Sequence, residues 1–233
     1  VPFVMAPGVL SYLAQRGALA GRVREAARFS KLAAVLHPTA RARFNAALSQ
    51  AMVHENADMN VAALAELVSA STPEQKVVIA AMQARELARW PEVTAILNTS
   101  PDLANGLTTL QLRALGEVGR VEEMVRLYEA SKTALSTFDV QMGQLFLMAF
   151  TGRVSAVQLM LSRQFSKMDD ETKRYWTALA GLGAPEHAAA GREQMARLAR
   201  EAHAHAADAA RGLPDLTKLR LRPTRHASRR SRR

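Results

Sequence analysis

A histidine-containing segment near the C-terminus is the one cluster in this sequence whose residue types suggest metal ligands. It comprises Glu201, His203, His205 and Asp208. Residues two positions apart on a helix point in different directions, whereas histidine pairs that bind zinc from one helix usually lie four positions apart. The position four residues after His203 is Ala207. We therefore expect a solvated helix end here and no metal site.

Signatures of catalysis are also incomplete. His54-Glu55 matches half of the H-E-x-x-H motif of zinc proteases, but Asp58 stands where the second histidine is needed. His37 directly precedes Pro38, where we expect a capping or packing role. The chain has no G-x-S-x-G motif and no glycine-rich phosphate loop. We predict no catalytic residue, no metal ligand and no cofactor, although a site built from distant residues would leave no such local signature.

Aromatic and apolar runs have structural explanations. Leu145–Phe150 is the most apolar run in the interior of the sequence, and we expect it to form a central helix buried on both sides rather than a lipid or cofactor site. Tyr175-Trp176 is compatible with a groove, but a core position is favoured. The acids Asp169, Asp170 and Glu171 suit the start of a helix, where negative charge complements the helix dipole.

The composition favours an all-helical protein. Of 233 residues, 48% are hydrophobic and only 5% are aromatic, and alanine, leucine and methionine are strong helix formers. There is no cysteine, so disulfides and thiolate metal sites are excluded. The chain is long enough to bury a sizeable core in one or two domains.

The net charge of +10 comes mainly from the C-terminus. Lys218–Arg233 carries eight of the 31 basic residues and no acidic one, so the remainder has 23 basic against 21 acidic residues. We expect residues 212–233 to form a disordered Arg-rich tail. Such a tail suits phosphates of nucleic acid or anionic lipid, but it lacks aromatic residues for base stacking. A shifted reading frame in a GC-rich gene would also encode it, and no specific nucleic-acid partner is expected.

Residues 1–14 form an apolar segment broken by Pro2 and by Pro7-Gly8. It is shorter than the roughly 18 apolar residues that a membrane span needs. Two interpretations stay open: the end of a membrane helix, or a first helix packed on the rest of the domain. Because basic residues follow it, a membrane helix here would place the body on the cytoplasmic side. The alternative is a cytoplasmic protein without a membrane tether.

The spacing of turn signals predicts a helical repeat over residues 15–211. Turns are expected near residues 21, 56, 89–91, 119, 152 and 183, at intervals of 30–35 residues, a period typical of solenoids of helix pairs. Three of them share Gly-Arg-Val, at 21–23, 119–121 and 152–154. The helices are expected at 9–19, 22–36, 39–54, 59–70, 73–89, 91–98, 105–118, 121–134, 137–151, 154–165, 169–182 and 185–210.

Within these hairpins the sequence resembles tetratricopeptide (TPR) repeats, over about residues 9–205. After the turn at Gly21, the small residues Ala26 and Ala33 and the closing Pro38 match the second helix of that family. Other units match less completely, with Gly119, Tyr128 and Ser131 at the turn, aromatic and small positions, and Met124 in place of a small residue. The resemblance implies a right-handed TPR-like α-solenoid of about six helical hairpins.

A second resemblance is to the soluble helical-repeat region of bacterial rhomboid-family intramembrane serine proteases. It rests on short strings at 36–39 with 42–44, 113–120 with 123–124, 161–164, and 173–176. A rhomboid protease needs a membrane-embedded Ser–His dyad, and this sequence has neither the spans nor the serine motif. The resemblance therefore implies an accessory fragment from which no catalytic residue is carried over.

We predict a non-catalytic scaffold for a protein or peptide partner, because stacked hairpins present concave faces that suit such ligands. The resemblance would make it the soluble accessory region of a membrane-bound rhomboid-type protease. The alternatives are a free-standing TPR-like adaptor, an RNA-binding helical repeat, which the nearly neutral body disfavours, and a soluble enzyme.

Overall fold

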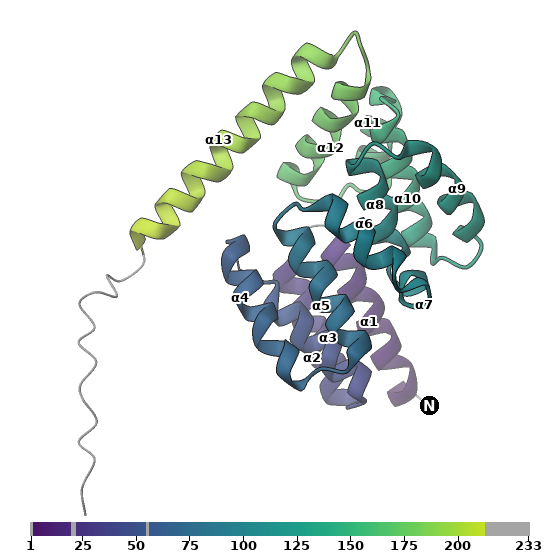
Figure 1. Ribbon diagram of the computed structural model, residues 1–233, viewed down its shortest axis with the longest axis vertical. Coiled ribbons are helices and arrows are strands. Elements are labelled where there is room, and N and C mark those ends of the chain that lie inside the picture. Colours follow the sequence, from purple (N-terminus) through teal and green to yellow (C-terminus); the bar gives the residue numbers. More distant parts are fainter. Residues whose placement is uncertain (1, 20–21, 55, 213–233) are drawn as a thin grey trace, which may run out of the picture.

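The computed structural model describes residues 2–19, 22–54 and 56–212, and the described residues contain helices and turns but no strand (Figure 1). The expected all-α class is confirmed. The helices are α1 (Pro2–Leu19), α2 (Val23–Leu36), α3 (Ala40–Ala51), α4 (Ala57–Leu67), α5 (Pro73–Glu86), α6 (Trp90–Asn98), α7 (Pro101–Ala104), α8 (Thr108–Glu117), α9 (Val121–Ser131), α10 (Thr137–Phe150), α11 (Val154–Arg163), α12 (Asp170–Gly183) and α13 (Ala188–Gly212). Short 3-10 turns cover Val68–Ala70 and Asn105–Leu107.

The first helix differs most from expectation. α1 begins at Pro2, seven residues before the expected start at residue 9, and it continues through Pro7-Gly8. Pro2 is the first residue of α1, where its missing backbone N–H removes no intrahelical hydrogen bond. Within the described residues, no helix combines the length and the apolarity needed to cross a membrane. The predicted tail lies outside the described residues beyond Gly212, which is still part of α13.

Four of the helical hairpins turn in the same way. The first residue of the turn has a positive φ in the three cases described: 52° at Ala88, 76° at Gly119 and 74° at Gly152. The next residue is always arginine, with φ between −83° and −85° and ψ between 54° and 68°. Its backbone N–H donates to a carbonyl five residues earlier, at 2.8–2.9 Å. This bond and the left-handed residue together form a common helix-terminating turn.

The turn arginines also begin the next helix. Arg22, Arg89 and Arg120 each pair with a glutamate three residues later, at 2.6, 3.7 and 2.5 Å. The sequence pattern Gly-Arg-Val marked three of these turns, but the turn at Ala88-Arg89-Trp90 has the same geometry without a glycine. The chain therefore uses the same turn four times. At Ala88 the turn is strained, because an alanine adopts the left-handed conformation there.

Replacing Ala88 by glycine should stabilise the protein. The left-handed conformation costs an L-residue about 1–2 kcal/mol, and the extra freedom of unfolded glycine returns part of that gain. We expect the free energy of unfolding in urea to rise by about 0.5–1 kcal/mol. The control is Ala95→Gly, at an exposed position inside α6, which should lower it by about 1 kcal/mol. A loss of stability in both variants would contradict the assignment of strain to residue 88.

The core is divided among neighbouring hairpins. One cluster joins α3, α4 and α5 through Ala51, Leu64 and Ile79. A second joins α5, α6 and α8, and its buried residues are Ala81, Ala84, Val93, Leu97 and Ala114. The largest lies among α8–α12 and includes Leu112, Met124, Leu145, Phe146, Val157 and Trp176. Each hairpin is buried against its neighbours, as in a repeat array.

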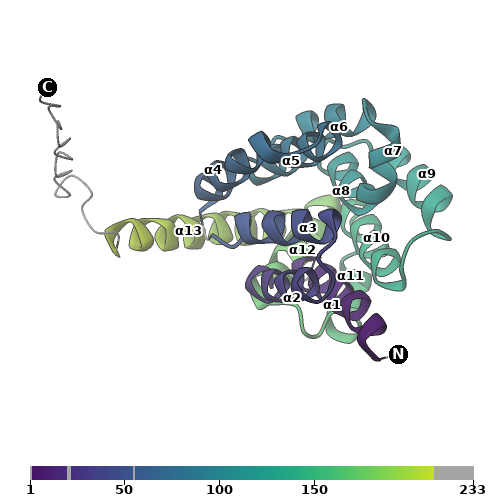
Figure 2. The ribbon, with the colours of Figure 1, turned by 90° about the horizontal axis from the view of Figure 1, so that it is seen from below.

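The hairpins from α4 to α11 follow an arc, with α6, α7 and α9 on its outer side and α8 and α10 on its inner side (Figure 2). The end of α1 and the start of α2 lie beside Phe138 at the start of α10 and beside the segment between α11 and α12. α13 packs along α12 and extends past the body. Gly181 and Gly191 allow this packing, since a Cβ on Gly191 would lie 2.9 Å from the carbonyl oxygen of Ala178.

Candidate binding surface

Arg113, in the middle of α8, is surrounded by three aromatic rings from other helices. Its guanidinium carbon lies 4.9 Å from the centroid of Trp90, the first residue of α6. It lies 5.2 Å from Trp176 and 5.6 Å from Tyr175, both in α12. A guanidinium at these distances is attracted by the electron-rich faces of the rings. The arginine therefore connects three hairpins at one point.

Glu117 holds this arrangement from the next turn of α8. One oxygen of its carboxylate lies 3.4 Å from Nε of Arg113 and accepts a hydrogen bond of 2.9 Å from the hydroxyl of Tyr175. The side chain of Arg113 is still 27% exposed, whereas that of Glu117 is 14% exposed. Trp90 and Tyr175 are half-buried. A fixed cation and two aromatic edges thus remain accessible to a ligand.

Polar pairs extend from Arg113 in both directions. Toward the N-terminal side, Arg85 and Glu86 lie 3.8 Å apart at the end of α5, and Glu86 accepts a 2.7 Å bond from the side-chain amide of Asn60 in α4. Toward the C-terminal side, Arg174 of α12 lies 2.9 Å from Glu201 of α13. We name this row, together with Trp90, Arg113, Glu117 and Tyr175, the Arg113 track. It crosses α4, α5, α6, α8, α12 and α13.

Burial alters the ionisation of two groups in the track. Desolvation is the main cause that raises the pKa of Tyr175 to about 12, and the carboxylate of Glu117 adds to the rise while Arg113 opposes it. Desolvation lowers the pKa of Arg85, with Glu86 opposing and Arg113 reinforcing this shift. Each arginine of the track is paired with a glutamate, Arg85 with Glu86, Arg113 with Glu117 and Arg174 with Glu201. The row therefore presents charges of both signs and no net charge.

The raised pKa of Tyr175 predicts a loss of stability at high pH. Tyrosine in the unfolded chain has a pKa of about 10, so between pH 10 and 12 the unfolded state releases this proton more readily than the folded state. The stabilisation is complete below about pH 10 and is lost as the pH rises through about 12. We expect the free energy of unfolding in urea to fall over this interval, and to fall less in Tyr175→Phe. Equal slopes in the two proteins would contradict the assignment.

The sequence-based candidates are distributed as follows. Trp176 is a core residue, 2% exposed and 4.9 Å from the ring of Phe146, while its neighbour Tyr175 also lines the track. Within Leu145–Phe150, Leu145, Phe146 and Ala149 are buried and the other residues are half-buried, as expected for a central helix. Asp169 caps α12 by accepting a 2.7 Å bond from the N–H of Thr172.

The histidine candidates are not brought together. His54 and His37 are exposed, and the backbone N–H of His37 closes α2 on the carbonyl of Ala33. The side chains of His203 and His205 lie outside the described residues. Among the residues that are described, no group of three or more histidine or acidic side chains is close enough to hold a metal ion.

Sequence reasoning missed Trp90 and Arg113 as surface residues. The turn pattern at residues 89–91 predicts only a turn position for Trp90. Arg113 is part of one of the short strings that carry the rhomboid resemblance, and no surface role is predicted for it. The residues that meet at Arg113 are 23 positions before it and 62 positions after it, and no local spacing encodes such a meeting. Their approach depends on how three hairpins stack.

Comparisons with known proteins give no assignment: no family model, no curated protein and no solved structure matches this chain.

Proposed function

We propose that this chain is a right-handed TPR-like α-solenoid of six hairpins that works as a non-catalytic scaffold for protein–protein interaction. Its ligand is an extended peptide or a helix of a partner protein, bound along the Arg113 track. The observation that carries the proposal is the accessible guanidinium of Arg113, fixed among Trp90, Tyr175 and Glu117. Aromatic residues and arginine are the residue types that dominate binding energy at protein interfaces.

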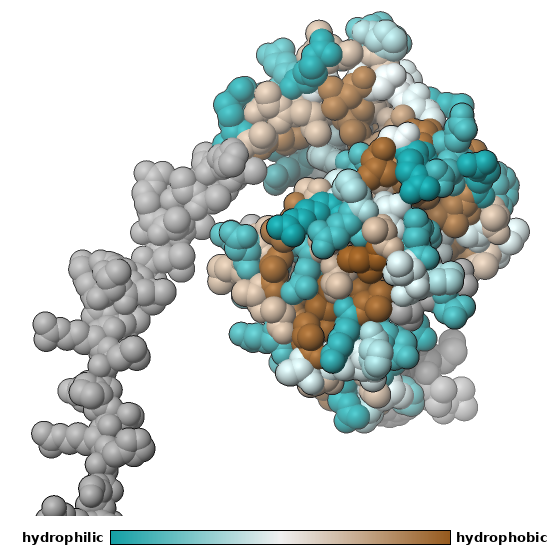
Figure 3. Space-filling view, viewed as in Figure 1, coloured by the Kyte–Doolittle hydropathy of each residue, from teal (hydrophilic) through white to brown (hydrophobic). Residues whose placement is uncertain are grey.

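The chemistry of the track favours a particular kind of peptide. Arg85, Arg113 and Arg174 are each paired with a glutamate of the track, so the row offers a ligand both guanidinium donors and carboxylate acceptors. The half-buried Trp90 offers an apolar ring beside them. The face of the molecule in Figure 3 mixes hydrophilic residues with small apolar patches. We therefore expect the bound segment to combine charged side chains of both signs with an apolar side chain that packs on Trp90.

Selection from a random peptide library tests the proposal. Peptides that bind the wild-type protein should bind Trp90→Ala at least tenfold more weakly, since truncating a central aromatic anchor commonly costs about 2 kcal/mol or more. Arg113→Lys keeps the charge but loses the planar guanidinium and should also weaken binding. The control is Arg126→Gln on α9, an exposed residue away from the track. Failure to select any peptide, or equal loss in the control, would contradict the proposal.

The rhomboid resemblance extends this proposal. In that interpretation the scaffold is the soluble accessory region of a membrane-bound rhomboid-type serine protease, and the track positions a substrate or partner for the protease. The body would then lie on the cytoplasmic side, with the N-terminal segment as a membrane tether. Sequencing the transcript beyond both ends of this chain tests this, since a downstream polytopic segment with Ser and His is required.

The free-standing adaptor is the second candidate, and it needs no other part of a protease. An RNA-binding repeat is the third, and the nearly neutral body weighs against it. Filter binding of RNA to a protein truncated after Arg211 separates these alternatives. Retention of RNA without the tail would favour the RNA-binding repeat.

A further inference from the structure

A second surface, independent of the Arg113 track, lies where the first hairpin meets the start of α10 and the segment between α11 and α12. A cavity of about 160 Å³ opens there. The first hairpin contributes Arg16 and Arg22, the end of α11 contributes Arg163, and the segment between α11 and α12 contributes Lys167. Phe138, at the start of α10, forms part of the wall. Residues more than 110 positions apart in the sequence therefore meet around one space.

Four of the residues that line this cavity are cations and none is an acid. Arg22 has one partner, Glu25, whose carboxylate lies 2.6 Å from one terminal nitrogen. Asp169 and Asp170 follow the cavity segment without lining it. Asp169 caps α12 with one oxygen, and its other oxygen is buried without a hydrogen-bond partner, while Asp170 lies 3.3 Å from Nζ of Lys173. With Glu25 paired to Arg22, the residues that line the cavity still carry an excess of positive charge.

Two details suggest that the cavity is built for a ligand. Nε of Arg22 is buried and has no hydrogen-bond partner, and a buried donor without a partner costs about 1–3 kcal/mol. Arg16 is oriented by Phe138, with its guanidinium carbon 5.7 Å from the ring centroid. Arg22 thus has an unpartnered N–H donor, and the guanidinium of Arg16, which lines the same cavity, is held in place by Phe138.

We propose that this cavity binds a phosphate group, either as a free phosphate anion or as the phosphate of a lipid headgroup. Arginine donors in a fixed fork match phosphate oxygens, and the volume is that of about five water molecules at roughly 30 Å³ each, enough for one phosphate with residual water. The bound anion links the first hairpin to the segment between α11 and α12 and neutralises their mutual repulsion.

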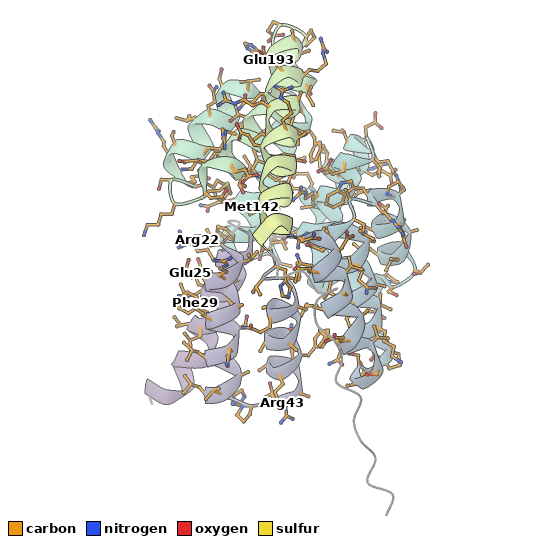
Figure 4. All side chains as sticks on the ribbon, turned by 90° about the vertical axis from the view of Figure 1, so that its left-hand side faces the viewer. Arg22, Glu25, Phe29, Arg43, Met142 and Glu193 are labelled. Atoms are coloured by element: carbon orange, nitrogen blue, oxygen red, sulfur yellow. The ribbon has the colours of Figure 1, made fainter. Side chains whose placement is uncertain are left out.

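The first experiment is thermal unfolding of the whole chain with inorganic phosphate, against chloride at the same ionic strength. At phosphate tenfold above the dissociation constant, we expect the melting temperature to rise by about 3–6 °C. The double variant Arg163→Gln/Lys167→Gln changes two exposed side chains and should reduce the shift to near zero. The control variant Arg43→Gln/Lys76→Gln removes the same charge elsewhere and should keep it; Figure 4 places Arg43 at the far end of the first hairpins from Arg22.

A second arm identifies the source of the phosphate. Sedimentation with anionic phosphatidylglycerol vesicles should retain the wild-type protein and the control, but not the cavity variant, if the ligand is a lipid headgroup. A shift with inorganic phosphate and no vesicle binding assigns the site to a free anion. The proposal is overturned if phosphate and vesicles both have no effect, or if the cavity variant and the control respond equally.

Discussion

Gly152→Ala is expected to lower the free energy of unfolding by about 2–5 kcal/mol, one of the two largest effects of a single substitution that the fold predicts. Gly152 has φ of 74°, a conformation that costs an L-residue about 1–2 kcal/mol. A Cβ at this position would also lie 2.5 Å from the carbonyl carbon and oxygen of Gly183. The turn between α10 and α11 thus packs directly against the end of α12, and a methyl group must move one of two backbones.

Gly119→Ala is the matched control for this prediction. Gly119 has nearly the same φ, 76°, but a Cβ there would meet no atom within 4 Å. Its substitution should cost only the conformational strain, about 1–2 kcal/mol. The measurement is urea unfolding of both variants. Equal losses would show that the contact between the two turns contributes nothing to stability.

Trp176→Ala is expected to lower the free energy of unfolding by about 3–5 kcal/mol. The indole is 2% exposed and contacts the rings of Phe146, Phe150 and Tyr175, with centroids 4.9, 6.4 and 5.2 Å away. Truncation leaves a large cavity between α10 and α12. It also removes one of the three rings around Arg113.

Trp90→Ala is the control for this second prediction. Trp90 touches the same guanidinium but is half-buried, so its removal should cost less than half as much. The same urea unfolding experiment compares the two variants. A larger loss at Trp90 than at Trp176 would contradict the division between a core ring and a surface ring.

The helices and the turns between them were predictable because they are encoded locally. Each signal lies within a few residues of the structure that it determines. The signals are the Gly-Arg pair of a turn, as at Gly119-Arg120, the capping side chains of Ser136 and Thr72, and the apolar stripes of the helices. Ser136 accepts from the N–H of Asp139, and Thr72 forms a reciprocal capping box with Gln75. The turn at Ala88 was placed correctly but not recognised as the same turn, because its left-handed residue is not glycine.

The Arg113 track and the basic cavity were not predictable for the opposite reason. Each depends on contacts between hairpins, such as Tyr175 with Glu117 or Arg16 with Phe138, whose partners are far apart in the chain. Small shifts in hairpin stacking decide whether such groups meet. The periodicity of the sequence does not predict how one hairpin is placed against another.

Amide hydrogen exchange with and without a selected peptide tests the central claim most directly. If the Arg113 track is the binding surface, the peptide should slow exchange at the C-terminal end of α5, along α8 and in α12 around Tyr175. It should leave α9 and α11, which contribute no residue to the track, unchanged. Protection confined to α9 and α11, or no protection in the α5, α8 and α12 segments, would contradict the assignment of this surface to partner binding.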